Sequence, residues 1–256
     1  MLSEKVIVVT GGAGLLGQAF VRAIVEAGGI AVIADIDVDL GEKLSARLKA
    51  ELVCDRILFV PLDITSKESI GRLLEDMKAR FSRVDALVNC AYPRGANYGR
   101  KFEDVEYEDF CRNVSLHLGG FFLASQQFAL FFREQGFGNV VTLASVYGIV
   151  APRFEIYEGT TITMPVEYAV IKSALIHLNQ YMMRYFKGYP IRFNCISPGG
   201  IFDHQPERFL RHYESYAQTK GMLMPGDLTG TLVFLLSDLS EFINGQNLVV
   251  DDGWTA

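Results

Sequence analysis

The sequence predicts a single α/β domain built on a doubly wound parallel sheet of about seven strands. Short apolar, β-branched segments recur along the chain without polar alternation, as expected for strands buried on both faces. Segments with helical periodicity lie between them. No linker, repeat or low-complexity stretch divides the 256 residues, so residues 1–256 are expected to fold as one unit with a sizeable core.

The expected strands, in chain order, are Val6–Val9, Ala31–Ala34, Ile57–Val60, Ala86–Val88, Val140–Leu143, Ile191–Ile196 and Leu248–Val250. The intervening helical segments include Ala19–Glu26, Leu40–Leu52, Ser66–Phe81 and Val166–Tyr185. Two polar stretches interrupt the alternation, at Tyr92–Asp104 and at Phe202–Pro225. Ligands bind at the carboxyl ends of parallel strands, so these stretches are expected to form a wall and a lid (about 202–225) of a site.

Composition excludes several classes of protein. The net charge of −6 and pI near 5.3 argue against a surface for nucleic acid or an anionic membrane. The first strand begins at Val6, which leaves no room for a signal peptide, and no apolar run is long enough to span a bilayer. The four cysteines lack the spacing of a metal site, so reduced, mostly buried thiols in a cytoplasmic protein without bound metal are expected.

A glycine-rich stretch points to a dinucleotide. The first strand runs into Thr10-Gly11-Gly12-Ala13-Gly14-Leu15-Leu16-Gly17 and then a helix. Glycines allow a sharp turn and close approach to a pyrophosphate, and the helix start offers free N–H groups. This arrangement is typical of a Rossmann-type fold, with cofactor contacts expected from Gly11, Gly14, Leu15, Leu16 and Gly17.

The second and third strands end in carboxylates. Asp35 can accept hydrogen bonds from both ribose hydroxyls and would repel a 2′-phosphate, and no Arg or Lys follows it directly, which favours NAD over NADP. Asp35 also suits a helix N-cap, and Asp37 competes for both roles. Asp63, beside Ile64, is expected at the adenine or as a cap for the next helix. Small residues around Asn89 and Ala91 are expected to let the cofactor pass above the fourth strand.

Tyr168 and Lys172 stand four residues apart in a helical segment, so both project from one face. A phenol has an ordinary pKa of about 10, and a nearby ammonium favours its deprotonated form. Tyr216 and Lys220 share the spacing, but they fall in the expected lid, where a solvated face is more common. Ser145, just after the fifth strand, is placed to orient a substrate oxygen, or else to cap a helix.

These residues together resemble the short-chain dehydrogenase/reductase family over the whole chain. Matching positions are Thr10–Gly17, Asp35, Asp63, Asn89–Ala91, Ser145, Tyr168, Lys172, Ser197–Gly200 and Gly245–Gly253. The resemblance implies that Tyr168 is the acid/base, that Lys172 lowers its pKa and that Ser145 holds the substrate oxygen. It also implies that Pro198, Gly199 and the backbone near Ile201 hold the nicotinamide amide, and that the protein is a homodimer or homotetramer.

The chain departs from the family pattern at four places. Leu15 stands where a glycine is usual, so the glycine spacing matches the extended branch of the family. The later motifs match the shorter, classical branch. His117 replaces a catalytic asparagine and is expected either to relay protons to Lys172 or to be structural, with Asn113 or Ser115 compensating. Tyr92 and Asp203 are unusual residues near the expected substrate. The extra segment Arg153–Pro165 suits a polyhydroxylated substrate or an interface.

Two segments resemble one bacterial subgroup, the oxidoreductases of flagellin glycosylation and nonulosonic-acid pathways: Asn89–Arg94 and Phe154–Gly159. The function expected from this resemblance is an NAD(H)-dependent oxidoreductase that interconverts a secondary alcohol and a carbonyl on a sugar or amino-sugar derivative. Two alternatives stand beside it. One is a cofactor-binding regulator that has lost catalysis, and the other is a nucleotide-sugar epimerase or dehydratase with bound NAD.

Overall fold

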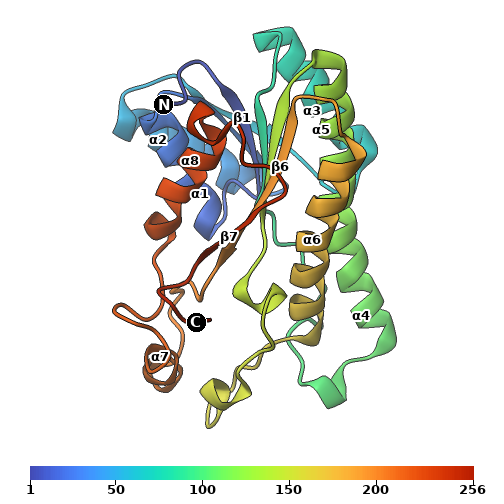
Figure 1. Cartoon of the computed structure of the whole chain (residues 1–256). Coiled ribbons are helices and arrows are strands. Elements are labelled where there is room, and N and C mark those ends of the chain that lie inside the picture. The colour runs from blue at the N-terminus through green and yellow to red at the C-terminus, as the bar shows by residue number, and fades with distance from the viewer.

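The computed structural model describes all 256 residues and contains one seven-stranded sheet, shown in Figure 1. The strands are β1 (Val6–Thr10), β2 (Ile30–Asp35), β3 (Ile57–Pro61), β4 (Ala86–Asn89), β5 (Gly138–Leu143), β6 (Ile191–Pro198) and β7 (Asn247–Val250). All pairs are parallel, in the order β3-β2-β1-β4-β5-β6-β7. The order reverses between β1 and β4, so the expected doubly wound fold is confirmed and a ligand crevice is placed at that point.

Helices cover both faces of the sheet (Figure 1). They are α1 (Leu15–Glu26), α2 (Val38–Leu52), α3 (Lys67–Phe81), α4 (Tyr107–Val114), α5 (Gly120–Gln135), α6 (Val166–Tyr185), α7 (Glu207–Glu214) and α8 (Thr229–Leu236). One core cluster packs β-strand side chains against α3, α5 and α6, and a second packs the opposite side chains against α1, α2 and α8. The strands are therefore buried on both faces, which explains their unbroken apolar sequence.

The helical run Tyr107–Gln135 corrects one expectation. It joins α4, a π-helical turn at Ser115–Gly119 and α5, and by length and composition it is apolar enough to cross a membrane. In the fold, Phe121, Phe128 and Phe132 on this run are fully buried against the sheet. These apolar side chains therefore pack in the core of the domain.

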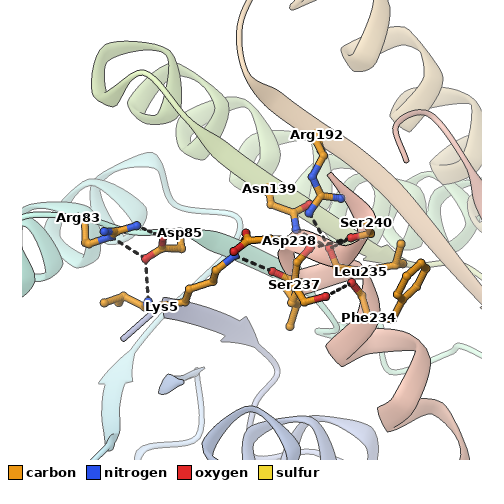
Figure 2. A network of polar contacts seen from close by, with 12 residues as sticks. Lys5, Arg83, Asp85, Asn139, Arg192, Phe234, Leu235, Ser237, Asp238 and Ser240 are labelled. Carbon is orange, nitrogen blue, oxygen red and sulfur yellow. Dashed lines mark hydrogen bonds and ion pairs between the residues drawn. The ribbon is translucent and has the colours of Figure 1, made fainter. Parts of the chain in front are cut away.

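Polar contacts close the amino-terminal edge of the sheet (Figure 2). The carboxylate of Asp85 is nearly buried, accepts a hydrogen bond from the Val6 amide at 2.8 Å and pairs with Arg83. This joins the starts of β1 and β4. Lys5 forms an ion pair with Asp238 at 2.5 Å, which ties β1 to the segment after α8.

The last turn of α8 is held at the same edge. The carbonyl oxygen of Leu235 accepts hydrogen bonds from the side chains of Asn139, Arg192 and Ser240, as Figure 2 shows. Carbonyl groups at a helix end have no partner within the helix, so these donors satisfy one of them. The amino-terminal edge is thus closed by structural contacts, and ligand binding is left to the carboxyl edge.

The cysteines are all free, as expected, but the expectation that most are buried is wrong. Cys195 is buried in the core, whereas Cys111 is exposed and Cys54 and Cys90 are half-buried. Cys111 follows the irregular segment after β4 on the short helix α4, where the outward face meets solvent.

An aromatic cluster covers the carboxyl edge of the sheet. The short 3-10 turn Phe154–Tyr157, inside the extra segment, packs against α7 beyond the lower end of the sheet in Figure 1. The cluster joins Val146, Tyr147, Ile156, Tyr157, Phe209, Tyr213 and Trp254. The extra segment, the expected lid and the C-terminal Trp254 therefore form one packing unit over the site.

Candidate active site

A crevice of about 930 Å³ runs along the carboxyl edge of the sheet, within the size range of small-molecule sites. Its wall includes nearly every residue expected to bind cofactor or substrate. These are Gly11, Gly14, Leu15, Leu16, Gly17, Asp35, Asp63, Ile64, Ala91, Ser145, Tyr168, Lys172, Pro198, Gly199 and Ile201. Asn89 and His117 are the two predicted residues that do not line it.

The turn between β1 and α1 needs its glycines for packing. Gly11 has a φ of +63°, and a Cβ there would lie 2.5 Å from the Cα of Ala91. A Cβ on Gly17 would lie 2.2 Å from the Gly11 carbonyl oxygen. Because no side chain caps α1 at Gly14, the first N–H groups of the helix face the crevice and suit an anionic pyrophosphate. Leu15 is 41% exposed, so replacing the usual glycine there meets no steric barrier.

Asp35 and Asp37, which the sequence left in competition, have separate roles. Asp37 accepts a hydrogen bond from the Leu40 amide as the N-cap of α2. Asp35 lines the crevice and accepts the Ala13 amide at 3.0 Å, which ties β2 to the glycine turn. Lys172 and Arg94 are the only cations on the crevice wall. The Asp35 end thus offers a carboxylate and helix N–H groups, a set that fits the ribose and pyrophosphate of a dinucleotide.

The ends of β3 and β4 differ from the expectation in detail. Asp63 accepts hydrogen bonds from the amide and hydroxyl of Thr65, and Ser66, not Asp63, caps α3. Asn89 is fully buried and donates to the Ser125 hydroxyl at 2.8 Å, so its side chain points into the core. The β4 end reaches the crevice through the residues that follow it, including Ala91.

Ser145, Tyr168 and Lys172 meet on one wall of the crevice, as the sequence predicted. Tyr168 and Lys172 lie one turn apart on α6, and Ser145 follows β5 and lies beside the Tyr168 hydroxyl. A Cβ on Gly148 would lie 2.7 Å from the Lys172 carbonyl carbon. This glycine lets the turn after Ser145 pack directly on α6, which brings the serine to the tyrosine.

The Lys172 ammonium is enclosed without a carboxylate. Its Nζ donates to the Leu143 carbonyl oxygen at 2.8 Å and lies 5.5 to 6.0 Å from the ring centres of Tyr168, Phe121 and Tyr92. Aromatic faces attract cations, but they replace only part of the lost hydration. Burial therefore lowers the pKa of Lys172 from 10.5 to about 8.

Burial also acts on the tyrosine. It raises the pKa of Tyr168 above 10, and the hydrogen bond from Ser145 opposes this rise. The sequence led to the opposite expectation, that the neighbouring Lys172 sets a lowered pKa. Loss of hydration is the larger effect on the Tyr168 pKa in this structure, because the phenol is buried. The phenol therefore holds its proton at neutral pH in this state.

His117 lies behind the wall, in the π-helical turn. It is 1% exposed, its Nε2 has no hydrogen-bond partner, and its ring packs on Tyr92 and Phe121 at 5.3 and 4.9 Å between centres. Burial, with the charge of Lys172, lowers the pKa of His117 well below 6.5. The imidazole is therefore neutral. Asn113 does not compensate for the missing asparagine, because both ends of its amide are bonded elsewhere.

Sequence reasoning missed much of the substrate half of the crevice. The missed wall residues include Leu116, Tyr147, Gln205, Phe209, Tyr213 and Met222. The Tyr213 hydroxyl accepts the Gly200 amide at 2.6 Å, which fixes α7 against the end of β6. The spacing of Phe209 and Tyr213 on one face of α7 was the signal available for this contact. Tyr92 and Asp203 line the crevice as expected, and so does the extra segment through Tyr157 and residues 162–165.

Comparisons with known proteins agree with this geometry. A family model described as enoyl-(acyl carrier protein) reductase matches residues 12–255. The chain is 43% identical to post-translational flagellin modification protein A of Campylobacter coli over 99% of both proteins. It is 28% identical to an NAD-dependent glycerol dehydrogenase of Listeria innocua, over 99% of this chain and 95% of that one.

Solved structures give the same result. A short chain dehydrogenase from Leptospira borgpetersenii with bound NAD+ is 32% identical and superposes with a TM-score of 0.86, covering 100% of this chain and 94% of that chain. The match therefore spans the whole domain, including the crevice and the wall with Ser145, Tyr168 and Lys172. The chain is an oxidoreductase that belongs to the short-chain dehydrogenase/reductase family.

Proposed function

We propose that this protein is an NAD(H)-dependent oxidoreductase that interconverts a secondary alcohol and a carbonyl on a sugar or amino-sugar derivative used in bacterial surface glycan synthesis. One observation supports the reaction above all others. Ser145, Tyr168 and Lys172 meet on the wall of a crevice whose other end presents Asp35 and the bare start of α1. Proton-transfer groups and a dinucleotide-shaped site thus share one cavity.

The three side chains have distinct parts in the proposed oxidation. The Ser145 hydroxyl holds the substrate oxygen, and the Tyr168 oxygen takes the hydroxyl proton. A nicotinamide held near Pro198, Gly199 and Ile201 would supply the acceptor for the hydride from the carbon that bears this oxygen. The Ser145 hydroxyl favours the phenolate against the effect of burial, and in the proposed reaction the nearby ammonium of Lys172 favours it as well. In reduction the protonated Tyr168 is already the form the acid step requires.

The preference for NAD over NADP rests on charge. The carboxylate of Asp35 would lie beside an added 2′-phosphate, and neither of the two cations of the crevice wall belongs to that end. The bound NAD+ of the Leptospira relative and the name of the Listeria relative agree with this choice. NAD is therefore the cofactor we propose.

The substrate class rests on the extra segment and on one relative. Thr163 and Tyr157 of the extra segment line the crevice together with Tyr147, and all three carry hydroxyl groups, which suits a polyhydroxylated molecule. The relative at 43% identity is named for flagellin modification, which fits a role in surface glycans. A cytoplasmic location and a homodimeric or homotetrameric assembly stay predictions.

Replacing Tyr168 by Phe tests the proposal. The variant should lose turnover by at least about 1,000-fold across a panel of sugars and amino sugars, because the acid/base group is gone. It should bind NADH within about twofold of wild type, and more tightly than NADPH, since Asp35 is unchanged. Tyr216→Phe is the matched control, because Tyr216 has the same spacing to a lysine but lies outside the crevice.

Each contrary outcome has a definite meaning. Turnover retained by Tyr168→Phe would refute the assigned acid/base. Tight NADH binding with no turnover by wild type on any sugar, amino sugar or simple alcohol would favour a regulator. Conversion of a nucleotide sugar with retained cofactor and no net NADH would identify an epimerase or dehydratase.

A further inference from the structure

The substrate half of the crevice has one positively charged wall. Arg94, in the segment after β4, is the only arginine that lines the crevice. The other cation on the wall, Lys172, is buried and bonded to the Leu143 carbonyl. Arg94 is exposed, so its guanidinium is free to meet a ligand. Asp203 is the only carboxylate among the wall residues of this half.

Arg94 has no protein partner for its charge. None of the ion pairs of the chain includes it. Nearby arginines are occupied: Arg100, in the same segment, pairs with Asp109, and Arg153 donates to the Trp254 carbonyl oxygen. The free donors of Arg94 therefore distinguish it from arginines that have a structural task.

The guanidinium is held in a defined place. It lies 4.7 Å from the centre of the Tyr92 ring, whose hydroxyl bonds that of Tyr98. The Tyr92 ring also contacts the ring of Tyr168, with 5.9 Å between centres. The guanidinium and the proposed acid/base therefore contact the same aromatic ring.

A buried chain of hydrogen bonds fixes the backbone beside Arg94. The Gly95 amide donates to Asn113 Oδ1 at 2.8 Å, and Asn113 Nδ2 donates to Glu167 Oε1 at 3.0 Å. Glu167 is 1% exposed and directly precedes Tyr168 on α6. Burying a carboxylate is unfavourable, and this one holds the Arg94 segment in register with the helix that bears the proposed acid/base.

We propose that Arg94 binds an anionic group of the substrate, a phosphate monoester or a carboxylate, while a secondary alcohol of the same molecule reaches Ser145 and Tyr168. The planar guanidinium presents paired donors that match two oxygens of either group. Two groups that contact the same Tyr92 ring suit a molecule the size of a six-carbon sugar, with the anion at one end and the reacting alcohol within the chain or ring. The inference rests on the proposed function and narrows its substrate class.

The test compares neutral hexoses and hexosamines with their 6-phosphates and with the corresponding hexuronic acids, each with NAD+. Wild type should favour one anionic set over the neutral set by on the order of 100-fold in kcat/KM, as expected for a charge-assisted bidentate contact. The better of the two anionic sets identifies phosphate or carboxylate as the group. Arg94→Gln keeps a planar amide on the Tyr92 ring and should remove most of this preference.

Two controls limit the interpretation. Arg100→Gln, in the same segment, should leave the preference unchanged, and its turnover of neutral sugars should differ from wild type by less than about threefold. Neutral sugars that react as well as anionic ones, or a preference that survives Arg94→Gln, would overturn the inference and leave the proposed function standing.

A separate measurement decides the inference if no sugar is turned over, a result that would count against the proposed function. Binding of hexose 6-phosphates and hexuronic acids to the NADH-loaded protein is then measured by calorimetry. Binding to wild type that Arg94→Gln weakens by at least about tenfold supports the anion site. Absent or equal binding overturns it.

Discussion

The buried ammonium of Lys172 is expected to destabilise the protein by a measurable and pH-dependent amount. Its pKa falls from 10.5 to about 8 on folding, because burial removes water from the charge. At 1.36 kcal/mol for each pH unit, this drop corresponds to a penalty of about 3 kcal/mol. The folded state favours the neutral amine, so the penalty is fully present below pH 8 and disappears above pH 10.5.

Replacing Lys172 by Met isolates the energetic cost of burying this charge. Methionine has a similar length, no charge and no titration, so the variant lacks the pH-dependent penalty. Between pH 7 and pH 9.5 the free energy of unfolding of wild type should rise by about 2 kcal/mol relative to Lys172→Met. The difference between the two proteins removes the common titration of buried tyrosines and cysteines, which acts in the same pH range.

Urea unfolding at pH 7, 8, 9 and 9.5 measures the effect, with Lys187→Met, an exposed lysine, as the control. Lys187→Met should follow wild type at every pH. Parallel curves for wild type and Lys172→Met would refute the reasoning, because they would show that the ammonium keeps its hydration or gains an equal stabilisation from the Leu143 carbonyl and the aromatic rings. A real penalty would indicate that the charge is retained for its role beside Tyr168.

Two further substitutions test the structural account. Asp85→Ala should lower the free energy of unfolding in urea by about 2 kcal/mol, because the buried Val6 amide loses its acceptor. The control Asp76→Ala removes an exposed ion pair and should change the free energy of unfolding by less than about 0.5 kcal/mol. Equal effects of the two substitutions would count against the polar network at the amino-terminal edge of the sheet. His117→Phe keeps the ring packing and removes an unpartnered buried nitrogen, so it should leave the unfolding free energy equal or higher while turnover falls at least about tenfold with a shifted pH profile. His117→Asn should restore part of that turnover, and unchanged turnover and pH profile in His117→Phe would show a purely structural histidine.

Much of the fold was readable in the sequence because it depends on local pattern. Strands buried on both faces give continuous apolar runs, so all seven were found with boundaries close to the observed ones. The glycine turn was equally readable, since Gly11 and Gly17 each occupy a position where a Cβ would collide with backbone. The spacing of Tyr168 and Lys172 predicted their common face, because four residues make about one helical turn.

The errors came from contacts between distant segments. Asn89 ends the strand β4, which leads to the crevice, but its side chain donates to Ser125 on α5 and therefore points into the core. The direction of the Tyr168 pKa was wrong, because a spacing along a helix says nothing of how far two groups are removed from water. The expectation that no apolar run is long enough to span a bilayer missed the helical run Tyr107–Gln135, because a helix that continues through a π-helical turn is not visible as one apolar run in the sequence.

The sequence alone determined that this chain forms a doubly wound domain with a dinucleotide turn and a Ser, Tyr and Lys set, because periodicity and spacing follow from backbone geometry. Only the tertiary structure decided which surfaces surround those residues. The roof that joins Tyr157 to Trp254 and the bonds from Gly95 through Asn113 to Glu167 link segments far apart in the chain. Packing across the fold sets such contacts, and they bring Arg94 and the proposed acid/base against the same ring, that of Tyr92.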